Sequence, residues 1–174
     1  MNDIPTSRPP VEVWMLVNLE PGFEDFEIGD RVTPTTIWIT ADAIPGGVPD
    51  SLLTTVAGHV EPDPNSQNYG WMHLGRRFPA SLPAWTGQPG PTRAEGLLLY
   101  DRYSWIKGPP REGAAVVLER ATLARPVTPL PTGYENWSIP QFHGCNILNR
   151  ERTAPEGTFI EWRCIRIGID SFCG

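Results

Sequence analysis

Apolar and polar residues alternate along much of this chain, with the two-residue period of a half-buried β-strand. The segment 11–19 places valine, methionine and leucine at its odd positions, and a similar alternation recurs at 54–61. The segments 31–40 and 95–106 are rich in β-branched, leucine and aromatic residues, which favour strands. The pattern therefore predicts strands in all four segments.

Three further segments carry a less regular pattern. Residues 114–125 fit a helix face as well as a strand, and we expect a strand because the surrounding segments are strand-like. In 158–170 the apolar parity changes between Trp162 and Ile165, which predicts a β-bulge or burial on both faces. Asp50 is placed to cap one short helical turn.

Proline and glycine separate these segments. The chain has 20 prolines and 17 glycines among 174 residues, with no collagen period and no low-complexity tract. Pro34 confines its strand to a sheet edge or to a start after the proline, and 79–94 and 126–140 are expected to be long irregular loops. The prediction is an all-β fold: an antiparallel small barrel or sandwich of about seven to eight strands with long Pro/Gly-rich loops.

The chain length suits a single domain. We expect a flexible N-terminal tail at 1–10 followed by one β-barrel-like domain at 11–174. The alternative is two tandem small barrels at about 11–78 and 92–174. Each half would be near the size at which a hydrophobic core becomes marginal, which favours the single domain.

The net charge of −6 conceals an asymmetry along the chain. Residues 1–66 carry eleven acids and two bases, whereas residues 67–125 carry eight bases and four acids. An acidic chain argues against a nonspecific nucleic-acid binder, although a basic face in the middle third remains compatible with it.

The apolar segments and the cysteines indicate the cellular location. No run of apolar residues is long enough for a transmembrane helix, and the polar N-terminus does not resemble a secretory signal. The three cysteines all lie in the last thirty residues, which does not resemble a disulfide framework. These features predict a reduced, cytoplasmic protein without a membrane partner.

Aromatic and basic residues gather between positions 71 and 107. Aromatic rings stack on bases or sugars, and adjacent arginines neutralise phosphates. Alternation along 95–106 places Tyr100 and Arg102 on the exposed face, and Tyr103 and Trp105 in the core. The candidate ligand-binding residues are Trp71, His73, Arg76, Arg77, Tyr100, Arg102 and Lys107.

The C-terminal third holds the cysteine candidates. His143, Cys145, Cys164 and Cys173 match the ligand count of a zinc site, but they lack a C-x-x-C pair. We therefore expect no bound metal, and we expect Cys164 in the core as a small apolar residue.

Two further groups of residues have side chains that are used in catalysis or in metal binding. Cys145 precedes Asn146 and follows His143, as in a Cys–His–Asn set, with His59 and His73 as more distant partners. No cysteine-enzyme signature surrounds these residues.

The alternating residues His59, Glu61 and Asp63 carry metal-ligand chemistry, but prolines interrupt their strand and favour a solvated strand end.

The function predicted from these features is binding. The chain has no phosphate-binding loop, dinucleotide fingerprint or nucleophile elbow, so no catalytic residue is selected and no cofactor is expected. The first hypothesis is a protein-interaction module of inhibitor, immunity or regulatory type, whose acidic N-terminal third attracts a basic protein partner. The alternatives are an oligonucleotide or phosphorylated-ligand binder using residues 71–107, and a small β-barrel enzyme with its site in the barrel mouth.

Overall fold

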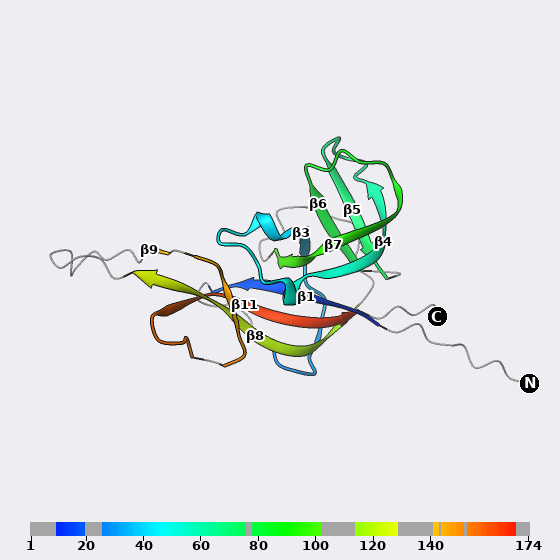
Figure 1. Ribbon diagram of the computed structural model, residues 1–174. Coiled ribbons are helices and arrows are strands. Elements are labelled where there is room, and N and C mark those ends of the chain that lie inside the picture. Colours follow the sequence, from blue (N-terminus) through cyan, green and yellow to red (C-terminus); the bar gives the residue numbers. More distant parts are fainter. Residues whose placement is uncertain are drawn as a thin grey trace, which may run out of the picture.

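The computed structural model of the chain describes residues 10–19, 26–75, 78–101, 114–128, 141–142, 144–151 and 153–169. Within these ranges the protein is all-β, with two short 3-10 turns and no α-helix, as the alternation predicts. Eleven strands join into one connected sheet (Figure 1). No helix in this part of the chain is long and apolar enough to cross a membrane.

Part of the sheet closes into a five-stranded barrel. Its strands are β3 (Thr36–Ile39), β4 (Thr54–Pro62), β5 (Tyr69–Leu74), β6 (Phe78–Pro83) and β7 (Gly90–Tyr100). Antiparallel pairing runs β3–β7–β4–β5–β6, and a parallel pairing of Ile37 with Ser81 returns from β6 to β3. The barrel therefore contains strands from both sides of the boundary that the two-barrel alternative requires.

The other strands extend the sheet away from the barrel (Figure 1). They are β1 (Val11–Asn18), β2 (Arg31–Val32), β8 (Ala115–Thr128), β9 (Gln141–Phe142), β10 (Ile147–Asn149) and β11 (Thr158–Ile169). Along one edge of β7, β4 pairs as far as Gly96, and β1 then pairs in parallel through Met15 and Leu16. β11 and β8 follow β1, so the extension grows directly from the barrel wall.

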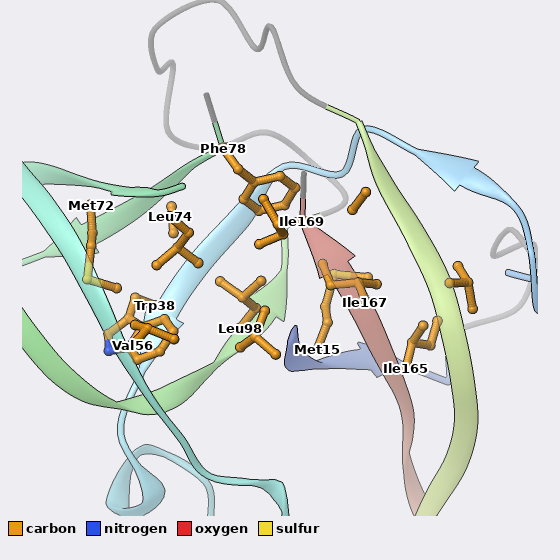
Figure 2. Close-up of a cluster of buried hydrophobic side chains, with 14 of the residues drawn as sticks. Met15, Trp38, Val56, Met72, Leu74, Phe78, Leu98, Ile165, Ile167 and Ile169 are labelled. Carbon is orange, nitrogen blue, oxygen red and sulfur yellow. The ribbon is translucent and has the colours of Figure 1, made fainter. Parts of the chain in front are cut away.

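One apolar core fills the barrel and continues over the extension. Figure 2 shows Leu98 between the barrel side chains of Trp38 and Val56 and the extension side chains of Met15 and Ile167. Leu98, Met15 and Ile167 are fully buried. This continuity explains why the central strands carry apolar residues on the face that points toward the barrel interior.

A second core covers the opposite face of the extension. The segment 41–53, with 3-10 turns η1 (Ala41–Ala43) and η2 (Asp50–Leu52), packs Ile44 and Leu52 against Trp14 and Leu16 of β1. The central strands are thus buried on both faces, which sequence alternation alone does not reveal.

Gly96 permits the close approach of β3 to β7. A Cβ at this position would lie 2.3 Å from the carbonyl oxygen of Ile39 and 2.9 Å from Cε2 of Trp38. Real Cβ atoms essentially never approach other atoms this closely. The glycine therefore lets the Trp38 ring and the β3 backbone pack directly on β7.

Prolines shape two of the predicted segments. The segment 31–40 contains β2 and β3, and β3 begins at Thr36, after Pro34, as one of the two expected outcomes. Residues 79–83, expected to be irregular, lie in β6. Each proline removes one backbone donor, and Pro79 and Pro83 flank Ser81, the β6 residue that pairs with β3.

The remaining strand predictions differ mainly at their ends. Residues 115–128 form a strand, as expected, but β8 continues past Pro126 instead of ending there. β11 is irregular beside Trp162 and is buried on both faces, as the parity change predicts. A 3-10 turn does begin at Asp50, although its N-cap residue is Pro49 and no side chain caps it. β7 begins at Gly90, earlier than predicted.

Candidate functional site

The structure describes three of the seven predicted ligand-binding residues. Trp71 on β5 is 5% exposed, so its ring is not available for stacking. His73, also on β5, is partly buried. The other four, Arg76, Arg77, Arg102 and Lys107, lie outside the described residues.

Tyr100, the third of these residues, is partly buried and packs against the core. Its ring meets the ring of Phe26 edge-on, with centroids 5.5 Å apart and planes at 84°. Leu98 lies in the same core, while Leu97 and Leu99 pack against the opposite face of β7. Tyr100 is therefore partly buried and not exposed as predicted, because other segments cover both faces of β7 at its end.

Strands β4 and β5 bring two histidines to one carboxylate. His59 and His73 are direct cross-strand partners, and Nε2 of each faces Glu61, at 3.9 Å and 3.3 Å respectively. The shorter distance permits an ion pair with protonated His73, but its Nε2 atom makes no hydrogen bond. Asp63 belongs to the following turn, where its Oδ1 accepts a hydrogen bond from the Asn65 amide at 2.8 Å.

The described residues contain no group of three His, Cys, Asp or Glu side chains arranged to hold a metal ion. Cys164 is fully buried in β11, as predicted, and burial raises the pKa of its thiol well above the ordinary value. Cys145 is an exposed free thiol. His143 and Cys173 lie outside the described residues.

Asn146, the neighbour of Cys145, has a structural role. Its side-chain amide donates to the carbonyl oxygens of Pro45, at 3.2 Å, and Gly47, at 2.7 Å. Its backbone amide donates to the Gly46 carbonyl at 3.2 Å. These bonds attach the start of β10 to the segment 41–53 through the backbone amide and Nδ2 of Asn146.

A groove of about 500 Å³ opens over the β8–β11 pair, on the face away from the segment 41–53. Arg120 and Thr122 of β8 and Arg163 and Ile165 of β11 form its floor. The complete lining is Phe26, Glu27, Ile28, Arg120, Ala121, Thr122, Arg150, Glu151, Arg163, Cys164 and Ile165. Polar and apolar side chains therefore meet in one concave surface.

The wall at 26–30 is a hydrogen-bonded turn. Gly29 adopts a φ of +94°, and its amide donates to the Val117 carbonyl at 2.8 Å. In return, the Val117 amide donates to the Asp30 carbonyl at 3.0 Å. The acidic-glycine sequence of this turn thus fixes Phe26, Glu27 and Ile28 beside β8.

The opposite wall follows β10. Asn149 is buried and donates its side-chain amide to the carbonyl oxygens of Glu151, at 3.2 Å, and Thr153, at 2.9 Å. Its Oδ1 accepts from the Glu151 amide at 3.0 Å. This local ring of hydrogen bonds holds Arg150 and Glu151 at the rim of the groove.

Ion pairs join the acidic N-terminal third to the arginines of β8 and β11. Glu27 contacts Arg120 at 2.7 Å, and Glu12 pairs with Arg166. Arg166 also contacts Glu119 at 3.1 Å. Part of the charge asymmetry along the sequence is therefore matched within the molecule.

Comparison with protein-family models, with curated proteins and with solved structures finds no match for the chain. The groove is accordingly the feature that bears on function. Sequence reasoning missed it because its lining comes from separate segments, although Arg120 and Thr122 share one strand parity, as do Arg163 and Ile165. That alternation is the signal from which its floor could have been found.

Proposed function

We propose that this protein is a binding module that acts through protein–protein interaction, and that the groove over β8 and β11 is its recognition site. The observation that carries the proposal is the groove itself, a cavity of about 500 Å³. Both its walls are held by backbone and side-chain hydrogen bonds, so the site is formed before a partner arrives. Ile28 at its rim is 65% exposed and offers an apolar contact.

The composition of the groove favours a protein partner over a nucleic acid. Glu27 and Glu151 lie among its arginines and would repel a polyanion. The nucleic-acid alternative uses Trp71 and Tyr100 as stacking rings, but Trp71 is buried and Tyr100 is partly buried against Phe26. An inhibitor, immunity or regulatory role in the cytoplasm fits such a module.

The partner need not be basic. Two acids of the N-terminal third, Glu12 and Glu27, already pair with arginines of this chain. Such pairs reduce the field that these carboxylates present to another molecule. The recognition chemistry is therefore expected to come from the groove lining.

Site-specific photo-cross-linking tests this proposal. A benzophenone-bearing phenylalanine is incorporated in place of Ile28 at the groove rim and, in a control protein, in place of Thr55, which is exposed on β4. Both proteins are irradiated in an extract of cells that naturally express the gene, and the adducts are identified by mass spectrometry. We expect one protein to be captured from position 28 and not from position 55, and to bind the unmodified chain after purification.

Two results would refute the proposed function. One is that positions 28 and 55 capture the same set of proteins. The other is that the adduct at position 28 contains nucleic acid instead of protein. Circular dichroism of both labelled proteins ensures that each is folded before irradiation.

A further inference from the structure

We propose that the groove recognises a segment of a partner protein in which a carboxylate stands between two apolar side chains, and that Glu27 holds the place of that carboxylate until the partner binds. This inference rests on the proposed function, since it names the chemistry of the partner.

The charge of the groove floor favours a carboxylate. Three arginines and two glutamates line the groove. Arg120 lies opposite Ile165 and Arg163 lies opposite Thr122, so the two arginines are diagonal neighbours on one face of the β8–β11 pair. A guanidinium group binds a carboxylate with two parallel hydrogen bonds, which gives both strength and direction.

The chain itself already places matching chemistry in the groove. Phe26 is 6% exposed and packs edge-on against Tyr100. The next residue, Glu27, brings its Oε1 within 2.7 Å of Nη1 of Arg120, and Ile28 then turns outward. This wall therefore brings an acidic side chain to Arg120. Apolar side chains of Phe26, Ile28 and Ile165 also line the groove and can contact apolar side chains that flank a partner carboxylate.

The Glu27 side chain is able to exchange. Its side chain is 60% exposed, although that of Arg120 is only 28% exposed, and ion pairs open to solvent contribute little to stability. Its backbone is held separately, because its amide donates to Oδ2 of Asp30 at 2.8 Å and its carbonyl accepts from the Asp30 amide at 3.0 Å. A partner carboxylate can therefore displace the side chain from Arg120 without opening the turn.

The same lining distinguishes a carboxylate from a phosphate chain. Glu27 and Glu151 line the same groove as the arginines. A single carboxylate requires the displacement of one acidic side chain, whereas a polyphosphate or an oligonucleotide brings further negative charge to Glu151. An acidic peptide is thus the ligand that the charges favour.

Fluorescence anisotropy with a defined peptide tests the inference. The probe is a fluorescein-labelled nonapeptide with one central Phe-Glu-Ile segment flanked by glycine and serine, and its control has lysine in place of the glutamate. We expect the acidic peptide to bind the full chain at least about tenfold more tightly than the lysine peptide. Glu27→Gln should tighten binding of the acidic peptide several-fold, because it removes the competing carboxylate.

Three variants assign the effect to the groove floor. Arg120→Gln should weaken binding of the acidic peptide about tenfold. Arg163→Gln tests the same floor if the first variant does not fold. Arg93→Gln, on an exposed position of β7 away from the groove, should leave the affinity unchanged.

The outcomes separate this inference from the proposed function. Equal binding of both peptides, an unchanged affinity in Glu27→Gln, or displacement of the peptide by inorganic phosphate at constant ionic strength would overturn the carboxylate inference. If position 28 still captures a protein partner in that case, the proposed function stands without the carboxylate inference. If position 28 captures none and the peptide does not bind, both proposals are wrong.

Discussion

Replacement of Gly96 by alanine tests whether the junction between the barrel and its extension depends on close backbone packing. The added Cβ would lie 2.3 Å from the carbonyl oxygen of Ile39, about 1 Å less than an ordinary carbon–oxygen contact. The backbone of β3 has to move away from β7 to relieve this overlap. The Trp38 ring, 2.9 Å from the same Cβ, blocks an alternative movement.

The expected cost follows from these contacts. Overpacking of a filled core costs about 1–3 kcal/mol, and each weakened hydrogen bond between the paired residues of β3 and β7 adds about 1 kcal/mol. We therefore expect Gly96→Ala to lower the free energy of unfolding by about 2–4 kcal/mol. In a chain of this length the melting temperature should fall by about 4–16 °C.

Equilibrium unfolding in urea, followed by tryptophan fluorescence and circular dichroism, measures this difference. Gly168→Ala in β11 is the matched control, because its nearest contact is the flexible end of Leu118, with Cδ1 at 3.1 Å. This control should remain within about 1 kcal/mol of the unmodified chain. If both variants unfold at the same urea concentration with equal slopes, the packing argument for Gly96 is refuted.

Two further predictions concern Cys164 and Asn146. Burial raises the pKa of the Cys164 thiol above its ordinary value of 9.0, so above that pH the unfolded chain loses a proton that the folded chain keeps. Above pH 9 the free energy of unfolding should therefore fall more steeply with pH in the unmodified chain than in Cys164→Ala, by up to about 1.4 kcal/mol per pH unit. Urea titrations at several pH values measure both dependences, and equal dependence on pH in the two proteins would contradict this prediction. Asn146→Ala removes the side-chain donor of the Gly47 carbonyl and one donor of the Pro45 carbonyl, which Arg125 also contacts. The change should cost about 1–3 kcal/mol, with faster hydrogen exchange at residues 46–48. Unchanged exchange there would show that Asn146 does not hold this segment.

The sequence by itself determined the fold class and most of the strands. Alternation identified β1, β4 and β11, because a strand with a buried face must place apolar side chains at every second position. It also favoured a strand over a helix for most of β8. These features are local, so neighbouring residues alone reveal them.

Only the tertiary structure decided which faces are buried and which residues meet. Tyr100 is partly buried because separate segments cover the two faces of β7, and local alternation cannot show a second covering layer. Pro79 and Pro83 were compatible with a strand because pairing of β6 with β3 uses the residue between them. The groove required Glu27 to meet Arg120 across 93 positions of the chain, a contact set by strand pairing and a turn anchored to Val117. Strand order is a long-range property, and for that reason the candidate site could not be read from residue spacing.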